Sequence, residues 1–189
     1  MSVAQPKMFT DDFRSQPYWW TGTPRSCADD TVLPRRVGVL VIGSGYTGLC
    51  AALQTMRGGR STLVIDAEDM GWGCSSRNGG QVSTGIKPDF VALSKRYGET
   101  KARAVLQEGA RALRWIGQFV KDEHLNCGFV ECGRFHGAHS TRQFDQIAYR
   151  LGRQPVDVRP EAYLVSRAEQ SSEINTDYYH GGVVFERHG

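Results

Sequence analysis

The sequence of 189 residues lacks several features that would dictate its location or its partners. No apolar stretch approaches the roughly 20 residues that a membrane-spanning helix needs, and the first thirty residues contain no apolar core of the signal-peptide kind. The net charge is only +3 and the basic residues are scattered, which argues against nucleic acid or an anionic membrane as a partner. Repeats and low-complexity tracts are also missing. We therefore expect a cytoplasmic protein with one domain, or one and a half.

Cysteine is sparse, and its arrangement suggests neither disulfides nor a metal site. The five cysteines are an odd number and are spread along the chain, as expected in a reducing compartment. Cys127, Cys132, His136 and His139 lie close together, but their spacing matches no common zinc pattern. On a strand the two histidines would also point to opposite faces. No metal is expected.

What the sequence does contain is a strand–helix–strand pattern in residues 37–66. The run VGVLVI (37–42) is almost wholly apolar, which is typical of a parallel strand buried on both faces. Residues 46–57 suit a helix that Gly58-Gly59 ends, and STLVID (61–66) suits a second strand. The helix should place four apolar residues on one side: Leu49, Ala52, Leu53 and Met56.

The remaining segments predict an arm, two helical regions and a mixed α and β region. Residues 1–36 form an irregular, proline-containing arm whose Tyr18-Trp19-Trp20 cluster should pack against the protein. A glycine-rich loop (71–85) follows the second strand. We expect helices at 88–98, 99–124 and 141–152, strands within 128–138, at 161–166 and at 181–189, and a capping box formed by Ser166 and Glu169. The expected domains are 1–36 (arm), 37–90 (nucleotide binding) and 91–189 (a second, incomplete domain).

The turn between the first strand and the helix fits the pattern G-x-G-x-x-G. Gly43 permits the tight turn, Gly45 leaves room for a pyrophosphate at the backbone, and Gly48 lets the helix pack closely on the strand. The amides at the start of the helix then face the phosphate oxygens. The pattern alone is weak evidence, but the strand before it and the helix after it supply the required context.

An acidic residue follows at the expected distance. Asp66 lies 18 residues after Gly48, at the end of the second strand. A carboxylate there accepts hydrogen bonds from a ribose 2′-hydroxyl and repels a 2′-phosphate. The sequence therefore predicts FAD or NAD as the ligand, and not NADP.

The segment DAEDMGWGCSSRNGGQVSTG (66–85) resembles the flavin loop of FAD-dependent oxidoreductases of the D-amino-acid-oxidase/glycine-oxidase (DAO) family. Together with GYTGL (45–49), the Tyr-Trp-Trp arm and GRFHGAH (133–139), it is most similar to the gamma-glutamylputrescine-oxidoreductase-like branch. The resemblance implies an α/β fold, with part of a Rossmann-like FAD-binding domain followed by part of an α+β substrate domain. It also implies FAD as the cofactor and oxidation of an amine or amino acid at its C–N bond.

The resemblance also implies which residues bind FAD. Asp66 stands where relatives usually carry glutamate, and Ser76 stands where many carry glycine. Arg77 could stabilise negative charge on a reduced flavin, or could simply pair with a nearby carboxylate. Cys74 is interpreted as a small buried residue and not as a covalent attachment point. The expected cofactor-binding residues are Gly43, Ser44, Gly45, Tyr46, Thr47, Gly48, Asp66, Ala67, Gly73, Cys74, Ser75, Ser76, Arg77, Asn78, Gly79, Gly80 and Gln81.

No residue is assigned as catalytic. His136, His139, Tyr178 and Tyr179 fall in the expected substrate domain, where packing is the favoured interpretation. Members of the family are longer, so the chain resembles their N-terminal half. We therefore expect a form that binds FAD weakly and is inactive without a complementary C-terminal half. The alternatives are an NAD-dependent dehydrogenase and a non-catalytic nucleotide-binding fragment or subunit.

Overall fold

A computed structural model describes residues 8–23 and 32–189 of the chain. Pro6, Pro24 and Cys27 of the arm lie outside the described residues. The chain divides into two compact units, one ending at Gly79 and the other beginning at Gly80. The expected domain boundaries at residues 36 and 90 stay a prediction.

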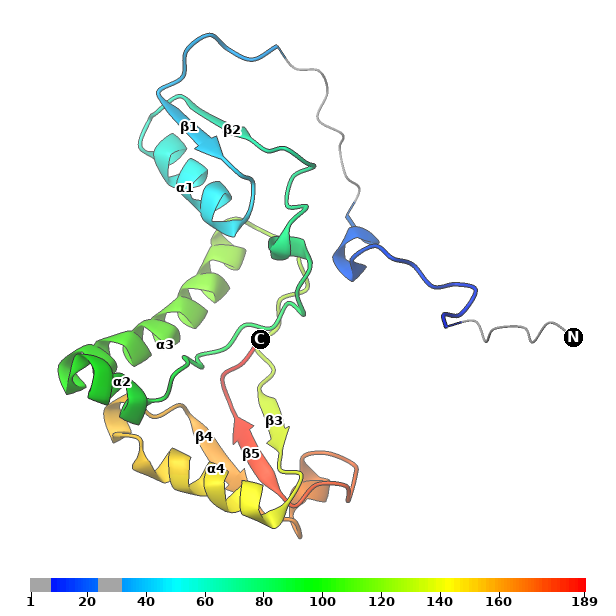
Figure 1. Ribbon diagram of the computed structural model, residues 1–189, viewed down its shortest axis with the longest axis vertical. Coiled ribbons are helices and arrows are strands. Elements are labelled where there is room, and N and C mark those ends of the chain that lie inside the picture. The colour runs from blue at the N-terminus through cyan, green and yellow to red at the C-terminus, as the bar shows by residue number, and fades with distance from the viewer. Residues whose placement is uncertain (1–7, 24–31) are drawn as a thin grey trace, which may run out of the picture. The chain divides into compact units, whose positions relative to one another are not determined.

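The first unit contains the predicted strand–helix–strand element (Figure 1). Strand β1 (Val39–Ile42) pairs in parallel with β2 (Thr62–Ile65), with Val39 opposite Thr62 and Ile42 opposite Ile65. Helix α1 (Tyr46–Arg57) connects them and packs on the sheet. Gly58 is its C-cap, and Gly59 has a left-handed φ of +74°, as expected for a helix that glycines end.

Helix α1 approaches the sheet through small residues, which corrects the predicted apolar face. Ala52 is buried, and the Thr55 hydroxyl lies 2.9 Å from the Thr62 hydroxyl of β2. Leu49 and Met56, which we expected on the buried side, are exposed. Small side chains allow the closer contact between helix and strand, so the larger residues remain at its margin.

The prediction that β1 is buried on both faces is also wrong for the described residues. Val39 and Val41 are partly buried, whereas Leu40 is 50% exposed and Ile42 is 80% exposed. Side chains alternate between the faces of a strand, so one face of this sheet carries α1 and the other is open.

The second unit pairs two helices and adds a small antiparallel sheet with a helix on it. Helices α2 (Phe90–Tyr97) and α3 (Glu99–Asp122) pack around a core of Phe90, Leu93 and Ala102. The sheet has the order β3-β5-β4, with all neighbours antiparallel, and α4 packs against β5. Its elements are β3 (Arg134–Gly137), α4 (Thr141–Arg153), η3 (Val156–Val158), β4 (Ala162–Val165), η4 (Gln170–Ser172) and β5 (Gly182–Phe185).

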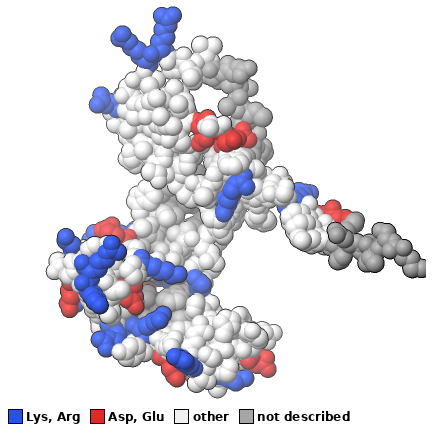
Figure 2. Space-filling view, in the orientation of Figure 1, with Lys and Arg blue, Asp and Glu red and all other residues white. Residues whose placement is uncertain are grey.

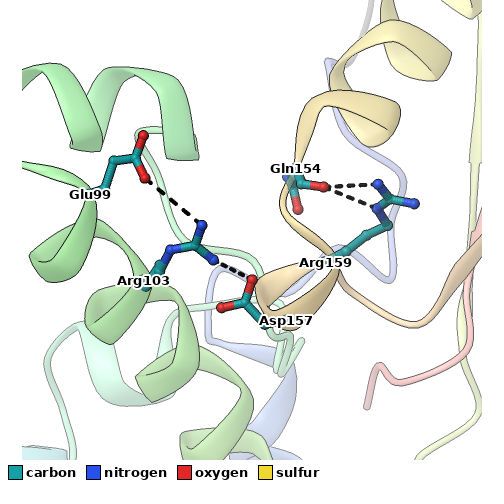
Figure 3. Close-up of polar contacts among 5 residues, drawn as sticks. All are labelled: Glu99, Arg103, Gln154, Asp157 and Arg159. Atoms are coloured by element: carbon teal, nitrogen blue, oxygen red, sulfur yellow. Dashed lines mark hydrogen bonds and ion pairs between the residues drawn. The ribbon is translucent and has the colours of Figure 1, made fainter.

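Polar contacts join the segment after α4 to α3 (Figure 3). Arg103 of α3 binds Asp157 of η3 and lies 3.9 Å from Glu99 one turn earlier. The Arg159 guanidinium donates to the Gln154 carbonyl at 2.9 Å, which closes the turn around η3. The hydrogen bond with Asp157 raises the pKa of Arg103, and the same bond lowers the pKa of Asp157, so both groups stay ionised.

Acidic and basic side chains are interspersed on the viewed face of the second unit (Figure 2). No large basic patch gathers there, in line with the scattered charges of the sequence. Within residues 8–23 and 32–189, no helix has the length and apolar character needed to span a membrane.

Candidate functional site

The glycine turn lies at the carboxyl ends of both parallel strands. Gly43 directly follows β1, and its amide donates to the Ile65 carbonyl of β2 at 2.7 Å. Its φ of +101° is in the region that favours glycine, so the turn requires glycine here. Gly45 is the N-cap of α1 and has no side chain to accept from the amides of the first turn. The Tyr46 amide donates to the Ser75 hydroxyl, and the amides that follow it can face a ligand.

At two of the glycines, an added Cβ atom would come too close to a neighbouring atom. A Cβ on Gly48 would lie 1.9 Å from the Gly43 carbonyl oxygen, so the close contact of helix and strand excludes every other residue. A Cβ on Gly45 would lie 3.1 Å from the Ser75 hydroxyl. Packing of the helix on the strand thus requires glycine at position 48, and a side chain at position 45 would press on the Ser75 hydroxyl beside the turn.

Ser44 joins this turn to Asp66. The Ser44 amide and hydroxyl both donate to Oδ2 of Asp66 at 2.6 Å, and the Glu68 amide donates to Oδ1 at 3.1 Å. The Ser44 hydroxyl in turn accepts from the Gly71 amide at 3.0 Å. The side chain of Asp66 therefore lies beside the turn and is held by backbone on both sides.

These contacts keep the Asp66 carboxylate charged. Chiefly through the hydrogen bonds from Ser44, they lower the pKa of Asp66 from its ordinary 3.8 to about 2. The residue is exposed, so solvent and ligands can reach it. Amides of the protein and the Ser44 hydroxyl already donate to both oxygens, so a ligand hydroxyl would share these acceptors.

The glycine-rich loop forms a short 3-10 turn, η2 (Cys74–Ser76), next to α1. The Ser75 hydroxyl accepts from the Tyr46 amide at 3.1 Å, which ties the loop to the first turn of α1. The Asn78 side chain is used internally, because it donates to the carbonyls of Cys74 and Ser75 at 3.0 Å. These two bonds hold the loop together around η2.

Arg77 lies between two tryptophans. Its guanidinium carbon is 4.3 Å from the ring centre of Trp72 and 4.9 Å from that of Trp20, and its Nε donates to the Trp72 carbonyl at 2.8 Å. Within the described part of the chain, no salt bridge joins Arg77 to a carboxylate. Among the described residues, the contacts of Arg77 are with the two tryptophan rings and a carbonyl oxygen.

The other expected site residues take the following places. Thr47 is exposed in the first turn of α1, Ala67 follows Asp66, and Gly73 is the N-cap of η2. Cys74 is exposed in η2, which corrects its expected burial, and it is a free thiol like Cys50, Cys127 and Cys132. Gly79 ends the first unit, while Gly80 and Gln81 begin the second.

Three of the residues considered in the second unit, His139, Tyr178 and Tyr179, form an aromatic cluster. His139 lies 5.4 Å from Tyr179 and 6.0 Å from Tyr178, ring centre to ring centre, and Phe135 packs edge-on against Tyr179. Burial lowers the pKa of His136, whose backbone in β3 pairs with Val183. These contacts fit packing roles, and no group of three metal-ligating side chains gathers in the described ranges.

Sequence reasoning missed the part that tryptophan plays at this site. The arm was expected to pack, but its partner was not identified. Trp19 and Trp20 bond to the glycine-rich loop, and Trp72 lies within it. The arm and the loop are more than fifty positions apart in the sequence, so no local sequence pattern predicts their contact.

Comparison with known proteins identifies the family. The family model described as FAD dependent oxidoreductase (DAO) matches residues 38–189. A Rhizobium meliloti (strain 1021) protein named "Probable oxidoreductase OrdL" is 29% identical over 152 residues, which cover 79% of this chain and 35% of that protein. The gamma-glutamylputrescine oxidoreductase of Escherichia coli (strain K12) is 34% identical over 100 residues, covering 51% of this chain and 23% of that protein.

Solved structures share the fold. Glycine oxidase from Bacillus cereus ATCC 14579 aligns with a TM-score of 0.58 at 15% identity, over 82% of this chain and 41% of that one. The L-amino acid deaminase from Proteus myxofaciens, in complex with anthranilate, aligns with a TM-score of 0.60 at 16% identity, over 87% of this chain and 35% of that one. The predicted α/β fold and the family resemblance are confirmed. The chain spans well under half the length of these relatives.

Proposed function

Because this chain belongs to the FAD dependent oxidoreductase family, we propose that its first unit binds the ADP half of FAD at the turn 43–48. The amides at the start of α1 bind the pyrophosphate, and Asp66 accepts hydrogen bonds from the ribose. The observation that carries this proposal is the junction made by Ser44, which places a charged carboxylate beside an open glycine turn.

The loop 73–81 lies against the flavin in this proposal. Small residues let the backbone come close to a flat ring, and the guanidinium of Arg77 provides a fixed positive charge near it. The residues assigned to this part are Gly73, Cys74, Ser75, Ser76, Arg77, Asn78, Gly79, Gly80 and Gln81.

The reaction we propose is oxidation of a C–N bond in an amine or amino acid. Bound FAD would supply the acceptor for a hydride from the carbon next to the nitrogen, and water would hydrolyse the resulting imine. The names of the relatives support this substrate class, since they include a gamma-glutamylputrescine oxidoreductase and a glycine oxidase. The protein's own contribution is to hold the donor carbon in line with the flavin and to exclude bulk water.

The isolated chain is expected to bind FAD weakly and to lack turnover. The open face of the sheet exposes Leu40 and Ile42, and burial of such a face normally needs a second layer. We propose that a complementary polypeptide segment covers this face in the active enzyme. A 189-residue preparation that is monomeric, yellow and active on amines would contradict this part of the proposal. The cytoplasmic location stays a prediction.

Competition between nucleotides tests the binding mode. FAD is titrated into the chain while its tryptophan fluorescence is followed, and ADP, NAD and NADP are then added as competitors. The proposal predicts saturable FAD binding that ADP weakens, with NADP the poorest competitor because its 2′-phosphate meets Asp66. Tighter binding of NAD than of FAD would favour the alternative of an NAD-dependent dehydrogenase. Binding of FAD without turnover, even with the complementary segment present, would favour a non-catalytic subunit.

A further inference from the structure

In the described part of the N-terminal arm, a 3-10 turn, η1 (Tyr18–Trp20), contacts the glycine-rich loop. The Trp20 indole N–H donates to the Ser76 hydroxyl at 2.9 Å, and the Trp19 indole N–H donates to the Asn78 carbonyl at 2.8 Å. The Ser76 hydroxyl in turn donates to the Gly71 carbonyl at 2.6 Å, so Trp20 is linked to the start of the loop through Ser76. Two consecutive tryptophans therefore bond to two loop positions that flank Arg77.

The ring of Trp20 also covers one side of Arg77. The guanidinium carbon lies 4.9 Å from this ring and 4.3 Å from the ring of Trp72, both within the range of a cation–π contact. Trp72 belongs to the loop itself, whereas Trp20 comes from the arm. The conformation of Arg77 thus depends on a residue that lies outside the loop.

We propose that Trp20 is a positioning residue that fixes the loop 73–78 and aims the charge of Arg77 at the flavin. This inference rests on the proposed function for its flavin-directed part. The arm then belongs to the cofactor site, although it contains none of the residues expected to touch FAD. Its role is to reduce the number of conformations that the loop must give up when FAD binds.

The alternative is that η1 merely covers apolar surface. Two observations weigh against that. Both indole N–H groups are bonded to specific loop atoms, and Trp19 remains 42% exposed, so burial of its ring is incomplete. The contacts concentrate on Ser76, Arg77 and Asn78, which are the residues assigned to the flavin loop.

We call the contacts by which Trp20 holds the loop 73–78 the clamp. Limited proteolysis tests this clamp without any cofactor. Trypsin cleaves after Arg77, and the rate at this bond is measured by mass spectrometry, with cleavage after Arg60 as the internal reference. Trp20→Ala should speed cleavage after Arg77 about tenfold, because a cation–π contact and a hydrogen bond are lost. Trp20→Phe, which keeps a ring but loses the N–H, should give an intermediate rate. Phe13→Ala, a change of another exposed aromatic residue in the arm, should have no effect.

Flavin binding tests the positioning role. Trp20→Ala should weaken FAD binding about tenfold for the same lost contacts, and Trp20→Phe should restore part of the affinity. The reduction potential of bound FAD should fall in Trp20→Ala, because the guanidinium no longer holds its place near the ring. In an Arg77→Gln background, Trp20→Ala should leave the potential unchanged, since the charge that it positions is gone.

Each outcome separates the two proposals. Unchanged cleavage after Arg77 in Trp20→Ala would contradict the clamp. If the wild type binds FAD and Trp20→Ala binds it with the same affinity and the same reduction potential, the positioning role is contradicted but the proposed function is not. Failure of the wild-type chain to bind FAD would contradict the proposed function and the flavin-directed part of this inference together, while the cleavage rates would still decide whether the clamp exists.

Discussion

At the scale of single residues, Gly48 has the least room of the described glycines. A Cβ there would overlap the Gly43 carbonyl oxygen at 1.9 Å and would also press on Val41. The atom in the way is backbone, so the helix must move away from the strand. The third glycine of the turn is thus required by packing, independently of any ligand.

Gly48→Ala should therefore destabilise the first unit by about 1–3 kcal/mol or more, as overpacked cores do. Urea unfolding monitored by circular dichroism measures the change. Gly152→Ala is the matched control, because Gly152 also lies in a helix and a Cβ there meets nothing within 4 Å. The control should be neutral or stabilising. Equal stability of Gly48→Ala and the wild type would show that α1 does not pack on β1 as described.

Ser44 and Asp66 give a prediction about pH. Ionised Asp66 is favoured in the folded chain, since its pKa is about 2 there against an ordinary 3.8. Its contribution to stability is therefore present above about pH 4 and is lost as the pH falls through 2. Ser44→Ala should raise the pKa of Asp66 towards 3.8, as measured by carboxyl-carbon NMR.

The control for that measurement is Ser61→Ala, which changes a serine at the opposite end of β2. It should leave the titration of Asp66 unaltered. If Asp66 titrates near its ordinary value in the wild type, the hydrogen bonds from Ser44 do not hold it in solution.

At the scale of elements, helix α2 packs on α3 through two buried side chains, Phe90 and Leu93. Leu93 is 4% exposed and packs with Phe90 and Ala102, whereas Val91 on the same helix is 54% exposed. Leu93→Ala should cost about 2–5 kcal/mol of unfolding free energy, and Val91→Ala should change it by about 0.5 kcal/mol at most. Chemical denaturation of both variants provides the comparison. Similar losses in the two would contradict the packing of α2 on α3.

Elements were predictable where glycines and caps mark their ends. Helix α1 has the predicted bounds, Tyr46–Arg57, because Gly45 precedes it and Gly58 follows it. The strands expected within 128–138 are reduced to Arg134–Gly137, since Gly128 and Gly133 adopt positive φ and interrupt the extended chain. The capping contact of Ser166 and Glu169 forms, but the helix that follows is only the short η4.

The candidate site was predictable in its parts but not in its contacts. The spacing of Gly48 and Asp66 placed both at the ends of neighbouring strands, yet the bonds from Ser44 depend on three-dimensional geometry. The stacking of Trp20 on Arg77 joins two distant segments, and no periodicity encodes such a contact. The exposure of Leu40 and Ile42 was also not predicted. An apolar run indicates that a strand face favours burial, but it does not indicate which element covers that face.

At the scale of the whole molecule, the glycine turn 43–48 lies within the first unit, and among the described residues α1 covers one face of its sheet. The turn, Asp66 and the loop to Gly79 all belong to this unit, so in the proposed binding mode the ADP half of FAD is bound by the first unit alone. Turnover requires more, because the donor carbon must be held against the flavin. We therefore expect cofactor binding and catalysis to be separable in this protein.

Equilibrium titration with FAD of the wild-type chain and of Gly45→Val tests the central claim most directly. Far-UV circular dichroism establishes that both chains are folded. The account predicts saturable binding by the wild type and at least about tenfold weaker binding by Gly45→Val, because the added side chain meets Ser75 and occupies the path of the pyrophosphate. Equal affinities, or no binding by a folded wild-type chain, would contradict it.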